Sequence, residues 1–424
     1  MKNIKDEFKN LIKTSKMIQL DGFHIMIVSK YFYSITDFKV LTKVNSKFKD
    51  TLSKFHFNPI PLTTVTLKYF PNIETLNIWS VDDECFGNQI LLNKSLQQKT
   101  KKVNFFKIIV WYQVTYNKLC PPNKTNLKTA EVVYKNVFYE KEENFKLIPQ
   151  NQNITKLAKF TKSSELSSIQ IPRTVTALDN DCFKGCISLT SIDLPNLITS
   201  LERSTFENCS SLRYVTLPNR LKCIKSECFY GCSVLKELDM SPEVDSIGMN
   251  AFAYCKQIEE MVVSPLVSLL RKNTFYNCSS LTKVVLPNSI WKISESCFMG
   301  CERLFEIKIP SSVSFLDNCA FCECKAITGI VIPNGVSYIS NKCFAKCSNL
   351  VKVEMSSNIE WIGEEAFAAC SRLSEIEILS KVRLLRNRCF EDCSNLTKVI
   401  IHGIEPQNES QCFNGCNIFT KEFK

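Results

Sequence analysis

The residues best suited to chemistry in this sequence of 424 residues are its 22 cysteines. Six of the segments that contain them read Cys-Phe-x-x-Cys, with the pairs Cys182/Cys186, Cys228/Cys232, Cys297/Cys301, Cys343/Cys347, Cys389/Cys393 and Cys412/Cys416. Two thiols four residues apart on a helical turn could bind a soft metal ion. Thiols in neighbouring units of a repeat could instead form disulfides. The three histidines, His24, His56 and His402, are too scattered to indicate a His-based metal or catalytic centre.

Both cysteine positions belong to an internal repeat of 23 residues. Phenylalanine recurs at this interval, without insertion or deletion, at Phe160, Phe183, Phe206, Phe229, Phe252, Phe275, Phe298, Phe321, Phe344, Phe367, Phe390 and Phe413. Three residues after each of these, except the first, stands a cysteine, from Cys186 to Cys416. The first unit has Ser163 at this position. A fixed interval of this kind is the sequence signature of a repeat architecture.

The repeat itself separates chemical from structural roles for the thiols. Directly before the Phe, cysteine exchanges with small residues: Thr205, Ala251, Thr274, Ala320 and Ala366. A position that accepts Ala and Thr requires small volume, so we expect buried residues there rather than metal ligands. The second cysteine would stand about 5 Å from its equivalents in stacked units, which disulfide geometry does not forbid. Eleven equivalent thiols cannot all pair, however, so we expect buried thiols with weak hydrogen bonds to the backbone.

The rest of each unit predicts a short strand followed by a turn. Leu189-x-x-Ile192-x-Leu194 and its equivalents end in alternating apolar positions, which is typical of a strand with one buried face. Proline often follows, and it lacks the N–H that the next ladder hydrogen bond would need. Two further apolar positions complete the unit, for example Val336 and Ile339. No unit can bury its apolar face alone, so stacked units must form one continuous core.

This pattern resembles the BspA type of leucine-rich repeat. The residues that carry the resemblance are the Leu-x-x-Ile-x-Leu-Pro strand, the Val-x-x-Ile pair and the run (Ala/Cys)-Phe-x-x-Cys-x-x-Leu, as in residues 339–350. The resemblance covers about residues 148–420. It implies an α/β repeat fold, a right-handed solenoid of about 12 units. It also implies a non-enzymatic binding protein, since members of this family bind other molecules and some lie on cell surfaces.

Strand positions that point away from the core predict a partner-binding face. In neighbouring units these positions hold Val262, Val285, Phe305, Val331 and Val351, which would form one apolar patch flanked by acidic residues. Contiguous exposed apolar surface marks contact sites, although β-branched residues also suit any exposed strand. The whole candidate face comprises Tyr214, Val262, Val285, Phe305, Lys308, Val331, Val351 and Glu354. A basic cluster in the last units indicates either an anionic partner or a solvated edge: Lys381, Arg383, Arg386 and Arg388.

The N-terminal third differs from the repeat. Residues 1–60 predict helices, which could cap the first apolar coil of the solenoid. Asp37 follows Ser34 by three residues, as expected where a helix begins, and apolar residues then recur three to four apart. Residues 61–147 predict irregular strands that are similar to leucine-rich repeats, and Thr64–Leu67 is expected to be one of these strands.

Leu20 through Leu52 is similar to an F-box, whose helices carry apolar residues in this order ahead of leucine-rich repeats. The segment departs from the motif at its start, where Leu20-Asp21 replaces the usual Leu-Pro. The resemblance implies that helices between Ile27 and Leu52 dock a ubiquitin-ligase adaptor, and that the solenoid binds the substrate. A capping helical bundle with the same spacing is the alternative.

Other features exclude several classes of function. The sequence has no Gly-rich phosphate loop, no Gly-x-Ser-x-Gly and no His-Glu-x-x-His, so we expect neither an enzyme nor a cofactor. Residues 1–150 hold 23 Lys against 13 acidic residues, but they lack a basic stripe with interleaved aromatic residues, so nucleic-acid binding is not expected. Neither a secretory leader nor an apolar run of 18 residues is visible, which predicts a cytoplasmic protein without a transmembrane segment.

Three functions therefore stay open. The first is a scaffold or regulatory module that binds protein partners through the exposed face of the solenoid sheet. The second is an F-box-type substrate receptor of a ubiquitin ligase. The third is a cell-surface adhesin or antigen. The exposed positions vary from unit to unit, so the sequence does not identify the partner.

Overall fold

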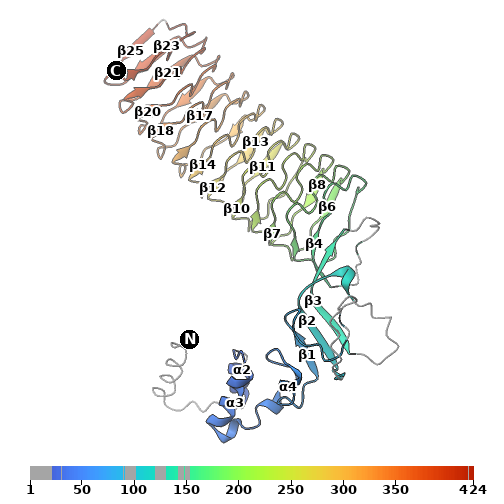
Figure 1. Ribbon diagram of the computed structural model, residues 1–424. Coiled ribbons are helices and arrows are strands. Elements are labelled where there is room, and N and C mark those ends of the chain that lie inside the picture. The colour runs from blue at the N-terminus through green and yellow to red at the C-terminus, as the bar shows by residue number, and fades with distance from the viewer. Residues whose placement is uncertain are drawn as a thin grey trace. The chain divides into compact units, whose positions relative to one another are not determined.

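The computed structural model describes residues 22–29, 31–88, 90, 102–119, 130–141, 148, 153–418 and 420–424 (Figure 1). The chain divides into two compact units, Met1–Val137 and Phe138–Lys424. The boundary falls inside strand β3 (Glu131–Glu140). The first part of the predicted helical segment, with the start of the F-box-like motif at Leu20, lies outside the described residues.

The described part of the N-terminal unit contains short helices followed by strands. They are α2 (Gly22–Ser29), α3 (Ile35–Val44), η1 (Ser46–Phe48), η2 (Leu52–Lys54), α4 (Thr64–Leu67), β1 (Thr75–Ile78), β2 (Lys107–Thr115) and η3 (Tyr116–Lys118). Helix α3 begins where the sequence predicts, because the Asp37 carboxylate accepts hydrogen bonds from the N–H and the hydroxyl of Ser34, at 3.0 and 2.9 Å.

The prediction of a strand at Thr64–Leu67 is wrong, since this segment is the helical turn α4. Its β-branched residues favour a strand, but local capping outweighs that preference. The Thr63 hydroxyl accepts from the N–H of Thr66 at 3.3 Å, and the Thr66 hydroxyl accepts from the N–H of Thr63 at 2.7 Å. The two bonds close a capping box and fix one helical turn.

The core of the N-terminal unit is aromatic. Phe38, Phe55 and Phe70 are buried and meet edge to face, with ring centroids 5.4–5.9 Å apart. Strand β1 pairs with β2 in parallel. The buried side chain of Asn58 donates to the carbonyl of Asn77 at 2.8 Å, and it thereby supplies a hydrogen-bond partner for β1.

The C-terminal unit is a solenoid in which each coil contributes up to two short strands (Figure 1). Strand β4 (Ile154–Ala158) pairs in parallel with β5 (Ala177–Leu178), at the start of the second strand row. The first strand row consists of β6 (Ser191–Asp193), β8 (Tyr214–Thr216), β11 (Glu260–Val262), β13 (Lys283–Val285), β15 (Glu306–Ile307), β17 (Gly329–Val331), β19 (Lys352–Glu354), β21 (Glu375–Ile378), β23 (Lys398–Ile401) and β25 (Thr420–Phe423). The second strand row consists of β5 (Ala177–Leu178), β7 (Ser200–Leu201), β9 (Cys223–Ile224), β10 (Ser246–Ile247), β12 (Leu269–Leu270), β14 (Lys292–Ile293), β16 (Phe315–Leu316), β18 (Tyr338–Ile339), β20 (Trp361–Ile362), β22 (Leu384–Leu385) and β24 (Gln407–Asn408).

The register between coils equals the sequence repeat. Strand β11 pairs in parallel with β13 so that Val262 lies opposite Val285, and β18 pairs with β20 so that Tyr338 lies opposite Trp361. Each pair is 23 residues apart, so equivalent residues of successive repeats form columns along the solenoid. The predicted leucine-rich-repeat solenoid is therefore confirmed.

The third side of each coil is the turn that carries the Phe and the Cys. The sequence suggests a short helical or 3₁₀ turn here, and bonds of that type occur, such as Cys186 N–H to the Phe183 carbonyl at 3.1 Å. The segment does not become a helix, however, because Asp181 and Gly185, two residues to either side of Phe183, have φ values of 56° and 69°. In this backbone the Phe183 N–H donates to the carbonyl of Thr205 in the next coil, at 2.8 Å.

The centre of the solenoid is a continuous aromatic stack. From Phe183 to Phe413, successive rings lie 5.4–5.6 Å apart and are parallel within 14°. Apolar residues of both strand rows close the core around this stack. Each ring therefore depends on the coils before and after it, as expected for a one-dimensional repeat.

Candidate protein-binding surface

The cysteine column is structural. Each of the eleven thiols from Cys186 to Cys416 donates a hydrogen bond to the carbonyl of the Phe in the preceding coil, with Sγ–O distances of 3.0–3.2 Å. Burial raises the pKa of Cys278 and of Cys370 to about 12, so both remain thiols at neutral pH. None of these eleven column cysteines forms a disulfide, and the weak backbone hydrogen bonds predicted from the repeat are confirmed.

Cys319 is an exception among the thiols. It is half-buried, and it occupies the left-handed position two residues before Phe321, with φ at 57°. A hydrogen bond from the Cys322 thiol lowers the pKa of Cys319, and the nearby Lys342 acts in the same direction. Both contacts favour the thiolate form of Cys319, a residue to which the sequence analysis assigns no role.

The predicted partner-binding face lies on the first strand row. In β11 and β13 the central residues Met261 and Val284 are buried, while the residues on either side of them face outward. The alternation follows from the two-residue period of a strand. Val262 and Val285 are exposed and lie directly opposite each other in the ladder.

The other predicted face residues are exposed but do not form one apolar patch. Lys308 occupies the coil after Val285, and Val331 lies opposite Glu354 in the pairing of β17 with β19. Phe305 and Val351 are both exposed, but Thr328 lies between them in their column. Tyr214 is exposed and bridges to Glu237; its strand lies three coils before the strand that contains Val285.

Paired charges complete this face. The Lys283 ammonium lies 2.6 Å from the Glu306 carboxylate, and Lys352 lies 2.7 Å from Glu354. The hydrogen bond that the Lys283 ammonium donates to the Glu306 carboxylate raises the pKa of Lys283. The predicted continuous apolar patch is thus a mixed surface, with the Val262–Val285 pair as its apolar centre.

A second exposed feature, which the sequence analysis missed, is a row of aromatic side chains on the second strand row. Phe315, Tyr338 and Trp361 each stand directly before the buried residue of β16, β18 and β20. Tyr338 and Trp361 stack with centroids 4.7 Å apart, and Phe315 meets Tyr338 edge-on at 6.4 Å. Trp291 adds an edge contact to Phe315 at 5.7 Å. A comparison of this column along the repeat would have revealed the row.

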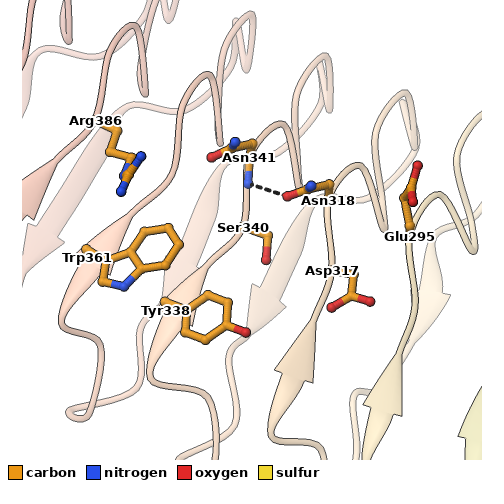
Figure 2. A pocket seen from close by; sticks show the side chains of 8 residues that line it. All are labelled: Glu295, Asp317, Asn318, Tyr338, Ser340, Asn341, Trp361 and Arg386. Carbon is orange, nitrogen blue, oxygen red and sulfur yellow. Dashed lines mark hydrogen bonds between the residues drawn. The ribbon is translucent and has the colours of Figure 1, made fainter.

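A pocket of about 390 Å³ adjoins the aromatic row (Figure 2). It is lined by Glu295, Asp317, Asn318, Tyr338, Ser340, Asn341, Trp361 and Arg386. Figure 2 shows Trp361 between Tyr338 and Arg386, with the two acidic residues toward the opposite end. The guanidinium carbon of Arg386 lies 5.1 Å from the Trp361 ring centroid.

Two other residues of the predicted basic cluster have contacts of their own. Lys381 donates to the Asn358 side chain at 2.7 Å, and Arg388 donates to the Gln411 side chain at 2.8 Å. Only Arg386 of the cluster lines the pocket. The cluster therefore does not act as one cationic surface.

In the F-box-like segment, the structure separates buried from exposed apolar residues. Phe38 and Leu41 are buried in the unit's own cores, so they stabilise the helices rather than contact a partner. Val40 and Val44, one turn apart on α3, are exposed, as is Ile27 on α2.

Within the described ranges, no group of three or more His, Cys, Asp or Glu side chains is placed to hold a metal ion. His56 lies 3.6 Å from Glu74, and His402 lies 3.6 Å from Glu377. The same residues include no helix with the length and apolar character needed to span a membrane.

Several solved leucine-rich repeat proteins are similar to this chain at low sequence identity. The chain is 22% identical to a leucine-rich repeat protein from Bacteroides ovatus, over 65% of this chain and 90% of that one, with a TM-score of 0.34. A leucine-rich cell surface protein from Faecalibacterium prausnitzii is 19% identical, over 76% and 89%, with a TM-score of 0.34. A leucine-rich repeat protein from Eubacterium ventriosum is 15% identical, over 74% and 84%, with a TM-score of 0.43. No curated protein sequence matches the chain.

The family model of the BspA type leucine-rich repeat region, which comprises six copies of the repeat, matches residues 131–259, 268–397 and 316–423. These matches cover more than half of the chain. They coincide with the coils whose phenylalanine rings stack on one another and whose cysteine thiols donate hydrogen bonds to the backbone of the preceding coil. The chain therefore belongs to the BspA type leucine-rich repeat family.

Proposed function

We propose that this chain is a non-enzymatic protein-binding module whose partner contacts the first strand row around Val262 and Val285. The observation that carries the proposal is the exposure of these two side chains, 61% and 44%, at opposite positions of a paired ladder. Their strand neighbours Met261 and Val284 are buried in the core. The exposed pair is thus held on a fixed backbone, which lowers the ordering cost of binding.

The charges around the pair support recognition by shape and apolar contact. Lys283 and Glu306 neutralise each other at 2.6 Å, so they add little net field to the surface. An apolar centre with a polar rim is the usual composition of a protein interface. We include Tyr214, Phe305, Lys308, Val331, Val351 and Glu354 in the wider face, as contacts around this centre.

Affinity capture with the full chain and a matched pair of variants tests the proposal. In the test variant, Val262→Glu and Val285→Glu place two carboxylates in the apolar centre. In the control, Leu266→Glu changes a residue of the same coil that is 55% exposed but lies in the turn after β11. We expect partners that the wild type and the control retain and the test variant loses. If both variants retain the same partners, the face is not the binding surface.

A second candidate function is docking of a ubiquitin-ligase adaptor by the helical segment between Ile27 and Leu52. The exposed Val40 and Val44 on α3 support it, because apolar residues at i and i+4 form a stripe that a partner can cover. The test is binding of purified adaptor to the full chain, to Val40→Glu/Val44→Glu and to the control Lys43→Ala. Adaptor binding that only the double variant loses is expected; no binding to the wild type would exclude this function.

We also propose that the protein works in a reducing compartment such as the cytoplasm. The proposal is supported by the column of hydrogen-bonded thiols, since extracellular proteins usually hold cysteines as disulfides. Protease treatment of intact cells tests it: protection is expected, whereas digestion would favour a cell-surface adhesin or antigen.

A further inference from the structure

Arg386 is held by an aromatic ring rather than by a carboxylate. Lysines on neighbouring columns form ion pairs with carboxylates of adjacent coils, such as Lys272 with Glu295 and Lys292 with Asp317, both at 2.8 Å. Arg386 has no carboxylate partner among the described residues. Its guanidinium lies over the ring of Trp361, 5.1 Å from the centroid.

The aromatic row fixes the position of this guanidinium. Trp361 stacks on Tyr338 at 4.7 Å with the rings within 4° of parallel, and the pairing of β18, β20 and β22 fixes both backbones. A planar guanidinium stacked on an indole keeps its N–H edge free for hydrogen bonds. The cation is therefore positioned before any ligand arrives.

The charge of the pocket next to Arg386 selects for one negative charge. The two acidic side chains at the other end, Glu295 and Asp317, are already neutralised by Lys272 and Lys292. Arg386 is the remaining charge that lines the pocket. A doubly charged phosphate would keep one charge unpaired here, whereas a single carboxylate pairs with one guanidinium in a fork-to-fork geometry.

The aromatic residues favour an apolar neighbour beside that carboxylate. Trp361 is covered by Tyr338 from the preceding coil and by Arg386 from the following one, so neither ring face is open for stacking a sugar. The row instead offers ring edges and the side of Phe315 to apolar side chains. The volume of about 390 Å³ lies within the range of ligand pockets, about 300–1,000 Å³.

We propose that this pocket binds an acidic side chain of an extended peptide segment in a partner protein. The Asp or Glu carboxylate pairs with Arg386, and a neighbouring apolar residue packs on Phe315, Tyr338 and Trp361. The site lies on the second strand row, apart from the Val262–Val285 pair on the first, so it is a binding surface beyond the function proposed above.

Fluorine NMR of the full chain labelled with 5-fluorotryptophan tests the proposal. The chain has four tryptophans, Trp79, Trp111, Trp291 and Trp361, whose signals are assigned by single Trp→Phe variants. The probes are two blocked peptides, acetyl-Phe-Glu-Phe-amide and acetyl-Phe-Gln-Phe-amide. We expect the Glu peptide to shift the Trp361 signal and to bind roughly tenfold more tightly than the Gln peptide.

Three variants connect that response to Arg386. Arg386→Gln should abolish the preference for the Glu peptide, and Arg386→Lys should retain part of it, because an ammonium keeps the charge without the planar fork. Arg383→Gln, an exposed residue three positions earlier that does not line the pocket, should behave as wild type. Equal binding of the two peptides, an unchanged preference in Arg386→Gln, or shifts confined to Trp79 and Trp111 would each overturn the proposal.

The same measurement separates this site from the first strand row. Val285→Glu should leave the Trp361 response unchanged, and Arg386→Gln should leave the partners captured through Val262 and Val285 unchanged. Failure of the peptide experiment would therefore not count against the proposed function.

Discussion

Replacement of a phenylalanine in the ring stack should destabilise the solenoid, and the loss of stability should be larger for a ring with two stacked neighbours than for a ring with one. Phe298 is fully buried and stacks on Phe275 and Phe321, both at 5.4 Å. Phe413 is half-buried and stacks on Phe390 alone, also at 5.4 Å. Phe298→Leu and Phe413→Leu make the same chemical change in the centre and at the end of the array.

The magnitudes follow from burial and ring contacts. A change from Phe to the smaller Leu in a core costs about 1 kcal/mol, and each lost aromatic pair costs about 0.5–1.5 kcal/mol more. We expect Phe298→Leu to lower the free energy of unfolding by about 2–4 kcal/mol. Phe413→Leu should lower it by about 1–1.5 kcal/mol, because it loses one ring contact and is partly exposed already.

Urea denaturation followed by circular dichroism measures both values. Because each coil contacts only its neighbours, Phe298→Leu should also divide the cooperative transition, whereas Phe413→Leu should only loosen the last coil. Equal losses in the two variants would refute the idea that the stack transmits stability from coil to coil.

Three further predictions follow from the backbone and the thiols. Ala369 has a φ of 59°, in the left-handed region that favours glycine, so Ala369→Gly should raise the free energy of unfolding by about 0.5–1 kcal/mol. The neighbouring Ala368→Gly should lower it, and urea denaturation measures both values. The reverse order would contradict a left-handed backbone at Ala369. Cys319 should react with iodoacetamide at neutral pH before the column thiol Cys301, as peptide mass spectrometry can show, because its pKa is lowered while burial raises that of Cys301. Burial raises the pKa of Cys278 from 9.0 to about 12, so the stability that this thiol contributes is complete below about pH 9 and is lost at higher pH. The difference in free energy of unfolding between wild type and Cys278→Ser should therefore shrink by about 1.4 kcal/mol between pH 7 and pH 10. A constant difference would contradict burial of the thiol.

The repeat could be predicted from the sequence because every coil must supply the same buried side chains to the core. One ring and one thiol per coil must stack on their equivalents, so Phe275, Phe298 and Cys301 recur at a fixed interval, and their burial follows. The exposure of Val262 and Val285 follows from strand alternation in the same way.

Other features depend on contacts that the interval does not reveal. At Thr64–Leu67, two hydroxyl-to-backbone bonds outweigh the strand preference of β-branched residues. The aromatic row is hidden because each strand of the second row has only two residues, so it has no alternating pattern along the chain. The role of Arg386 depends on its contact with Trp361, one coil earlier, which a search for charge clusters does not detect.

The central claim is that a partner contacts the first strand row at Val262 and Val285. The most direct test is photo-crosslinking in cells with p-benzoylphenylalanine at position 285, beside the same residue at position 266 in the turn after β11. We expect a discrete crosslinked species from position 285 that is lost when Val262→Glu is added, and none from position 266. Crosslinks of equal yield and pattern from both positions would contradict the claim.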